Sequence, residues 1–296
     1  MGGGRLVTVR VDSHHHLWDL AVRPQPWLAP DAMAPIRRSF AMVDLVADAS
    51  GSGFDATVVV QTVPDVAETE ELLDLAAATP LILGVVGFVD LQAPDVGEEL
   101  DRLRSRPGGG WLVGIRSPVQ DEPDPRWLLR PEVLSGLRAV AERGLVYDLL
   151  IRPRHLGAAL RAVTSVPDGR FVIDHLAKPA IASGGSEHWT AGMAALALRE
   201  NVAAKLSGLV TEASWQSWTL DDLRPYADHA LSCFGSDRVL FGSDWPVCRL
   251  AATYAEVAEA AEALTGPLNP RERDAVMGDT AVITYGLRVG ATGSTG

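Results

Sequence analysis

Three consecutive histidines near the start of the chain, in "RVDSHHHLWDL", have the residue type and spacing for metal or acid–base chemistry. The run is short and lies between apolar residues, unlike a purification tag, which sits in a flexible polar leader. If a strand continues through it, side chains alternate, so His14 and His16 share a face with Asp12 while His15 points away. Two imidazoles on one face can hold one metal ion or polarise one carbonyl group.

A carboxylate and a further histidine end two later apolar runs. Asp244, in "VLFGSDWPV", is suited to ligate a metal or to take a proton from water, and the alternative is a structural cap of the next loop. His175, in "FVIDHLAKP", would be structural if it were alone. Its neighbour Asp174 either orients another side chain or pairs with Lys178. We expect His175 and Asp244 to join the histidine pair in one catalytic group.

Other residues at the ends of apolar runs are candidates for substrate contacts. Arg116 in "GIRSP" and Arg152 in "LLIRP" offer a two-pronged guanidinium to a carboxylate or carbonyl group, with a structural salt bridge as the alternative. Lys205 in "NVAAKLSGL" is expected to pair with an acidic group or contact substrate, rather than form a Schiff base. Trp27 and Trp245 are candidate walls of the pocket.

Eight short runs rich in β-branched residues alternate with helical patterns along the chain. This alternation indicates a parallel sheet, and eight units favour one closed (β/α)8 TIM-type barrel of the α/β class. Catalytic side chains of such barrels come from the carboxyl ends of the strands, where the polar residues above stand. The predicted strands are 6–11, 56–61, 81–89, 111–116, 145–150, 171–175, 202–208 and 238–244. The predicted helices are Val66–Ala78, Pro131–Glu142, Thr190–Arg199, Ala251–Leu264 and a closing helix, Pro270–Tyr285.

Composition bounds the class of protein. We expect a single barrel over 6–288, disordered ends at 1–5 and 289–296, and a Pro-rich insert, Asp19–Ala41, over the barrel mouth or against its wall. A net charge of −12 without a long basic run argues against nucleic acid and anionic membranes. The lack of a leader, and of cysteines beyond two, favours the cytoplasm. The expected partner is a small molecule, with a homo-oligomer left open.

The motifs "VDSHHHLWD", "VGIRSP", "FVIDHLAKP", "VAAKLSGL" and "VLFGSDWPV" together resemble the amidohydrolase-2 branch of the amidohydrolase superfamily. They are most similar to its lactonases for L-fuconolactone, L-rhamnonolactone and 4-sulfomuconolactone. The resemblance implies a (β/α)8 barrel that hydrolyses a small polar lactone, and the expected substrate is the lactone of a sugar acid. It implies that Asp244 activates water, that His14, His16 and His175 assist, and that Arg116 holds the substrate.

The resemblance also implies one divalent ion, with zinc the expected metal, held by His14, His16 and Asp244, either alone or together with His175. Arg116 stands where relatives often carry a bridging ligand, which disfavours two metals, and metal-free catalysis stays open. Two other functions are alternatives. One is a metal-dependent decarboxylase of an unsaturated or aromatic acid, and the other is a barrel that binds a sugar acid without turning it over.

The two faces of the histidine run predict different mutational effects. His15→Ala should mainly lower thermal stability, whereas His14→Ala and His16→Ala should lower lactone turnover by about 100-fold or more with little unfolding. Thermal melting and a lactone-opening assay on the three variants separate these effects. A folded His15→Ala protein that has lost its turnover would contradict the assignment of faces.

Overall fold

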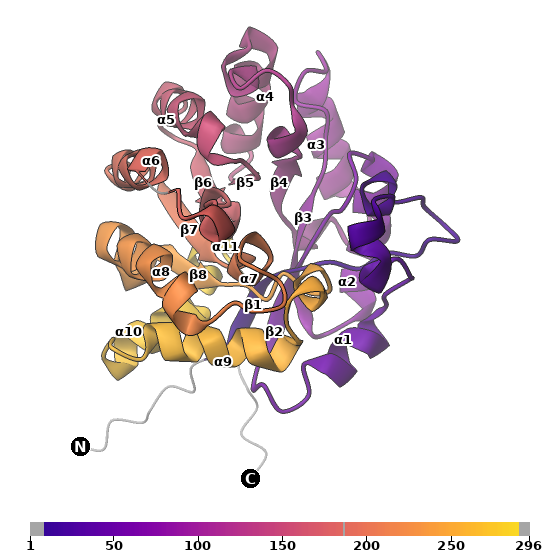
Figure 1. Cartoon of the computed structure of the whole chain (residues 1–296). Coiled ribbons are helices and arrows are strands. Elements are labelled where there is room, and N and C mark those ends of the chain that lie inside the picture. Colours follow the sequence, from indigo (N-terminus) through magenta and orange to yellow (C-terminus); the bar gives the residue numbers. More distant parts are fainter. Residues whose placement is uncertain (1–8, 186, 290–296) are drawn as a thin grey trace, which may run out of the picture.

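The computed structural model describes residues 9–185 and 187–289 of the chain. Eight parallel strands follow one another around a single sheet in chain order, with helices outside it (Figure 1). A bridge between His15 and Trp245 connects the last strand's end to the first strand. The predicted (β/α)8 barrel is therefore confirmed. The strands are β1 (Val11–His15), β2 (Ala56–Val60), β3 (Ile82–Gly87), β4 (Leu112–Ser117), β5 (Val146–Leu149), β6 (Arg170–Ile173), β7 (Val202–Leu206) and β8 (Val239–Phe241).

The helices lie between the strands at nearly the predicted places. The α-helices are α1 (Met42–Asp48), α2 (Val66–Ala78), α3 (Val96–Ser105), α4 (Pro131–Glu142), α5 (Leu156–Ser165), α6 (Glu187–Ala197), α7 (Leu209–Glu212), α8 (Leu220–Phe234), α9 (Tyr254–Thr265), α10 (Pro270–Asp274) and α11 (Thr280–Tyr285). The short 3-10 helices used below are η1 (Pro26–Leu28), η2 (Asp31–Ile36), η7 (Asp174–Ala177) and η10 (Val247–Leu250). None of the described helices is both long and apolar enough to cross a bilayer.

Several predicted elements differ from the structure in their bounds, for example the eighth strand, predicted as 238–244 and found as Val239–Phe241, and two elements need further comment. The described part of the first strand is Val11–His15, so the strand does continue into the histidines; residues 6–8 of the predicted strand lie outside the described residues. The predicted closing helix is interrupted by a π-helical turn, Ala275–Asp279, between α10 and α11. In this turn Gly278 lies so close to the backbone of Val9 that an added Cβ would be 1.9 Å from its carbonyl oxygen. The predicted tail 1–5, and residues 290–296 of the predicted tail 289–296, likewise lie outside the described residues.

The barrel has two apolar cores because each strand buries both of its faces. The outward faces pack against the helices in a large continuous cluster. The inward faces form a smaller cluster that includes Val58, Val146 and Val172, and Tyr285 of α11 packs against it from the closing segment. Burial of these side chains is the main favourable contribution to the stability of the barrel.

Next to this inner cluster the barrel interior becomes charged. Each of four charged residues lies two positions after a small or apolar interior residue, either within its strand or, for Asp174, directly after the strand. The period of 2 places it on the same face. Their side chains are 0–4 % exposed. The four residues are Arg116 after Gly114, Asp148 after Val146, Asp174 after Val172 and Lys205 after Ala203. The site is therefore built on a polar layer that lies directly on the apolar core.

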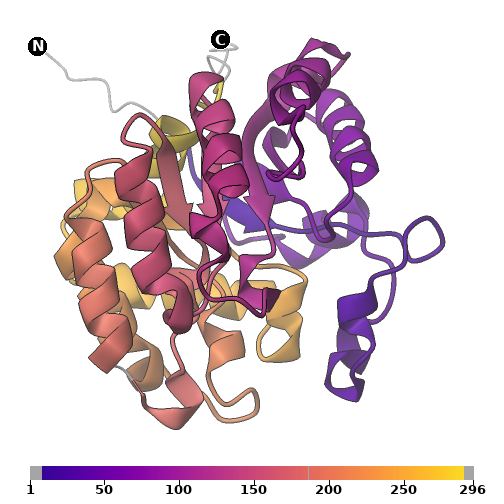
Figure 2. The same ribbon diagram turned by 90° about the horizontal axis from the view of Figure 1, so that it is seen from above.

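The insert Asp19–Ala41 lies against the wall of the barrel. Its elements η1 and η2 stand out to one side in Figure 2, and η2 contacts η10 after β8. Arg23 ion-pairs with Asp65 and Glu71 at the start of α2, at 2.7 and 2.6 Å. Of the two predicted placements, the structure thus selects the wall.

Side chains add to a short backbone bridge at the seam between β8 and β1. Asp12 accepts hydrogen bonds from the backbone N–H and the hydroxyl of Ser243 (2.8 and 2.6 Å), from the His14 N–H (3.1 Å) and from the Tyr254 hydroxyl (3.1 Å). The register of β1 against β2 shifts between Asp12 and His15. The simple alternation of side chains along the strand therefore does not hold for Asp12. Its carboxylate accepts hydrogen bonds at the seam between β8 and β1 and does not lie on the face of His14 and His16.

Removing the Asp12 carboxylate should destabilise the barrel. Asp12→Ala leaves buried donors of Ser243 and Tyr254 without an acceptor, so we expect a loss of about 3 kcal/mol in the free energy of unfolding. Asp19→Ala is the matched control. Like Asp12, Asp19 accepts hydrogen bonds through its carboxylate, but it accepts two of them and lies on an exposed loop. Urea unfolding of both variants measures the difference, and similar losses would contradict the role of Asp12.

Candidate active site

Three predicted residues meet at the carboxyl ends of β1 and β8. The Nε2 atoms of His14 and His16 are 3.2 Å apart. Asp244 Oδ1 lies 3.9 Å from the first and 3.6 Å from the second. All three side chains are nearly or fully buried, with at most 6 % exposed. The sequence prediction of a shared face for His14 and His16 agrees with this arrangement, and His15 points away to Thr57, at 3.0 Å.

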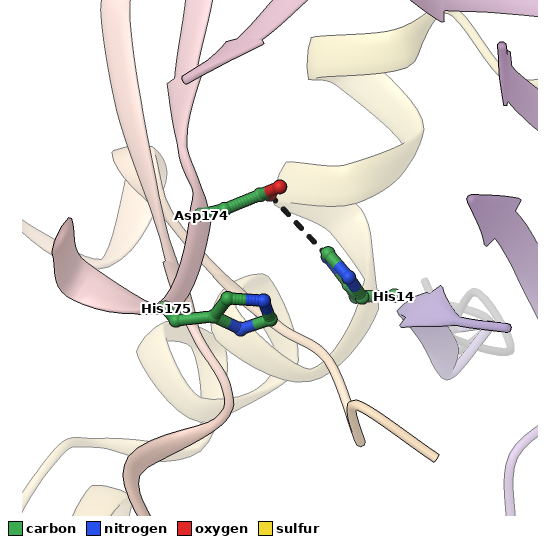
Figure 3. A group of neighbouring side chains, drawn as sticks. All are labelled: His14, Asp174 and His175. Carbon is green, nitrogen blue, oxygen red and sulfur yellow. Dashed lines mark ion pairs between the residues drawn. The ribbon is translucent and has the colours of Figure 1, made fainter. Parts of the chain in front are cut away.

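His175 reaches the same place from β6. Its Nε2 lies 3.8 Å from Asp244 Oδ1, and its ring centroid is 4.5 Å from that of His14. Figure 3 shows the His14 and His175 rings close together, with Asp174 directed at His14. The four predicted residues of the catalytic group are therefore neighbours in space.

The backbone that carries His175 is a left-handed turn. All four residues from His175 to Lys178 have positive φ, between 48° and 60°, and Asp244 has φ 56°. Such a conformation costs a non-glycine residue about 1–2 kcal/mol, so the surrounding structure must hold it. The buried Trp189 indole does so in part, by donating a 2.6 Å hydrogen bond to the Leu176 carbonyl oxygen.

Two glycines allow the site to close this tightly. A Cβ on Gly208, which has φ 63°, would lie 2.6 Å from His175 Nδ1 and 3.1 Å from Asp244 Oδ2. A Cβ on Gly242 would lie 2.6 Å from the Cβ of His14. Distances below 3 Å are not sterically possible, so only glycine fits at either position.

The other nitrogen of each active-site imidazole has a partner that fixes the ring. His16 Nδ1 lies 2.8 Å from the Val60 carbonyl oxygen, which only accepts, so this nitrogen donates. His175 Nδ1 lies 2.9 Å from the Ser207 hydroxyl, and His14 Nδ1 lies 3.3 Å from Asp174 Oδ1. Partners of this kind orient histidine ligands in metal sites. All three Nε2 atoms are thereby turned toward Asp244.

The donor set of His14, His16 and Asp244 fits one divalent metal ion. Zinc binds nitrogen at about 2.0–2.1 Å with tetrahedral geometry, which separates its ligand atoms by about 3.3 Å. The observed separations of 3.2, 3.6 and 3.9 Å need only small side-chain adjustments to meet this. Neutral imidazole and carboxylate are also ligand types that zinc prefers.

A second group, made of His14, Asp174 and His175, is a poorer metal site. The Lys205 ammonium lies 3.0 Å from Asp174 Oδ1 and 3.1 Å from His14 Nδ1. Arg116 Nη1 lies 3.1 Å from Asp174 Oδ2. Two protein cations already compensate this carboxylate, and they would repel a metal ion there.

Lys205 lies within the polar layer of the interior. Its ammonium is 2.5 Å from Asp148 Oδ2, and the Tyr285 hydroxyl donates to Asp148 from the closing helix. Burial raises the pKa of Asp148 to about 6, against the opposing effect of Lys205. Burial would also raise the pKa of Asp174, but Lys205, His14 and Arg116 outweigh it and hold that pKa well below its usual value. Asp174 therefore orients His14, while Lys178 pairs elsewhere, with Glu212.

The predicted substrate contacts lie at different depths. Arg116 is 4 % exposed, and its Nη1 lies 3.3 Å from His14 Nε2, directly beside the catalytic group. Arg152 is exposed at the mouth, 3.9 Å from Glu212, and Trp27 lies half-buried against Trp18 in the insert.

Lys205 and Trp245, in contrast, have no exposed surface. Trp245 donates a 2.8 Å hydrogen bond to Asp48 of α1, away from the catalytic group. Complete burial does not support a direct contact with substrate for either residue.

Sequence reasoning gave no specific role to Asp12 or Asp148. A signal for Asp148 existed in its spacing, because a charged residue two positions after an interior valine must face the barrel interior. The role of Asp12 had no such signal, because it depends on the irregular register of β1.

The comparisons with known proteins agree with this site. The amidohydrolase family model matches residues 11–287, so the chain belongs to this family. An L-fucono-1,5-lactonase from Burkholderia ambifaria is 40 % identical over 250 residues, which is 84 % of each chain. A crystal structure of an amidohydrolase from Burkholderia multivorans with bound zinc has a TM-score of 0.89 and 34 % identity, covering 95 % of this chain and 100 % of that one.

The decarboxylase alternative has weaker support among the solved structures. A 5-carboxyvanillate decarboxylase from Sphingomonas paucimobilis has a TM-score of 0.64 and 14 % identity, covering 95 % of this chain and 100 % of that one. Identity at this level shows only that the two proteins share a fold. The more similar relatives therefore favour lactone hydrolysis over decarboxylation.

Burial favours the neutral form of His14, His15 and His175, whereas the surroundings of Asp244 favour its ionised form. Burial lowers the pKa of His175 to about 4 and that of His15 to about 3. Burial, with Lys205, also lowers the pKa of His14 well below its usual value. Burial alone would raise the pKa of Asp244, but His175, His16 and His14 outweigh it and hold that pKa below its usual value.

These buried histidines predict acid sensitivity. Below about pH 6.5 the histidines of the unfolded chain bind protons that the buried histidines of the folded protein do not bind. The free energy of unfolding should therefore decrease as the pH decreases, by up to about 1.4 kcal/mol per pH unit for each histidine. Urea unfolding at pH 7.5, 6 and 5 measures the slope. His15→Gln should make the slope shallower, whereas the control His188→Gln, at an exposed histidine, should leave it unchanged. Equal slopes in all three proteins would contradict the prediction.

Proposed function

We propose that this protein hydrolyses a small polar lactone, namely the 1,5-lactone of a sugar acid. The observation that carries the proposal is the Asp244 carboxylate among three histidine Nε2 atoms, all within 3.9 Å. An ionised carboxylate beside neutral imidazoles suits proton transfer to and from water and an ester oxygen. The likeness to an L-fucono-1,5-lactonase supports a sugar lactone as the substrate class.

Asp244 is the proposed general base. Its Oδ1 faces the histidine rings, and its Oδ2 lies on the side of Gly208. The carboxylate takes a proton from water while the water oxygen forms a bond to the lactone carbonyl carbon. The charge that develops on the carbonyl oxygen is stabilised by the cationic Arg116 beside His14.

His175 is the proposed acid for the leaving group. Neutral His175 takes through Nε2 the proton that Asp244 removed from water, across a separation of 3.8 Å. As the ring C–O bond breaks, the resulting imidazolium gives this proton to the departing alkoxide oxygen, which restores both residues. The product hydroxy acid ionises in neutral solution, so each turnover releases one proton.

A zinc ion fits the donor set of His14, His16 and Asp244. When bound, it would act as a Lewis acid toward the carbonyl group and lower the pKa of a nearby water. The zinc-bound relative supports this assignment. The contact of His16 with the Val60 carbonyl oxygen and that of His14 with the Asp174 carboxylate orient the two rings for this ion.

The setting of the reaction follows from the sequence and is part of the proposal. Both cysteines, Cys233 and Cys248, are free, which suits the reducing cytoplasm. The proposed partner is the small lactone itself, and a homo-oligomer stays a prediction.

Replacing the proposed base tests the function. Asp244→Asn should lower kcat for lactone opening by about 100-fold or more, because the amide cannot accept the proton. Proton release, followed with a pH indicator across a panel of aldonic and muconic lactones, measures it. Asp228→Asn on the exposed side of α8 is the control and should retain full activity. A folded Asp244→Asn protein with most of its turnover would overturn the base assignment.

A further inference from the structure

Three charged side chains follow neighbouring strands at the barrel mouth. Arg152 comes after β5, Lys178 after β6 and Glu212 at the end of α7, after β7. Glu212 Oε1 lies 3.7 Å from Lys178 Nζ, and its Oε2 lies 3.9 Å from Arg152 Nη1. The side chains of Lys178 and Glu212 are each 17 % exposed, whereas that of Arg152 is 43 % exposed. We call Lys178 and Glu212 the rim pair.

The rim pair has unused hydrogen-bonding capacity. Its separation exceeds the 2.7–3.2 Å range of a hydrogen bond. Other ion pairs of this protein are tighter, for example Arg143 with Asp101 at 2.6 Å. Within the described part of the chain, no hydrogen bond is formed by the carboxylate of Glu212 or the ammonium of Lys178. Half-buried charges in this state are open to the polar groups of a ligand.

Both residues are close along the chain to the catalytic group. Lys178 is the last residue of the left-handed turn that begins at His175. Glu212 lies four residues, about one helical turn, after Gly208, whose Cα borders His175 and Asp244. The charge of Lys178 acts on His175, where it adds to the larger effect of burial. A short stretch of backbone therefore connects each residue of the rim pair to the catalytic group.

We propose that Lys178 and Glu212 bind the ring hydroxyls of the substrate and so select a polyhydroxylated lactone. This inference rests on the proposed function. A carboxylate accepts hydrogen bonds from hydroxyl groups, and an ammonium donates to their oxygen atoms, so the pair matches adjacent hydroxyls of a sugar ring. Arg152 Nη1 lies on the outer side of the pair, 3.9 Å from Glu212 Oε2. An unsubstituted lactone ring offers neither partner.

The test compares one lactone that carries ring hydroxyls with one that does not. The kcat/KM values for L-fucono-1,5-lactone and δ-valerolactone are measured for the wild type, Lys178→Met and Glu212→Gln. Each variant should reduce kcat/KM for the hydroxylated lactone by about tenfold or more and change that for δ-valerolactone by less than about threefold. The control is Glu99→Gln, which removes a charge from a partly exposed ion pair on α3 and should change neither value.

The ratio separates a binding role from a structural one. A structural salt bridge would alter both substrates alike, and an unchanged ratio in both variants would overturn the proposal. If the wild type opens neither lactone, the proposed function fails, but titration calorimetry with L-fuconate and 5-hydroxypentanoate still decides the role of the pair. Loss of L-fuconate affinity in both variants supports the pair, and unchanged affinity overturns it.

Discussion

The ammonium of Lys205 is buried in the barrel, and the carboxylates of Asp148 and Asp174 hold it there at 2.5 and 3.0 Å. Charges can be buried at this depth only when they are paired, since each costs several kcal/mol to remove from water. With Arg116, the two cations match the two carboxylates. Asp244 then adds a further carboxylate next to this layer, within 3.9 Å of His14, His16 and His175. The chemistry of the site depends on this additional carboxylate.

The polar layer also explains why strain at the mouth can persist. Asp174 is fixed by Lys205 and Arg116, and the chain leaves it directly into the left-handed turn of His175. The turn is unfavourable by itself, and it holds because the strand before it and the packing of Trp189 after it allow no other path. Stability of the barrel thus maintains a geometry that the local sequence does not favour.

Strand-by-strand periodicity was enough to predict the barrel and five helical segments, whereas α1, α3, α5, α7 and α8 were not predicted. Helices such as Val66–Ala78 have the predicted bounds because their apolar spacing and flanking strands leave little freedom. The catalytic group was also predictable, because carboxyl ends of parallel strands converge whatever the loops do. The depth at which each side chain is buried could not be predicted. Lys205 and Trp245, both proposed as substrate contacts from the sequence, are fully buried.

The sequence by itself therefore determined the fold class, the family and the four residues that meet at the mouth. Only the tertiary structure decided that Asp12 accepts hydrogen bonds across the seam between β8 and β1. It also decided that Asp174 orients the His14 ring and that Lys178 pairs with Glu212. The physical reason is that periodicity describes one strand at a time. Register between strands, positive φ after β6 and the pairing of buried charges depend on contacts between segments far apart in the chain.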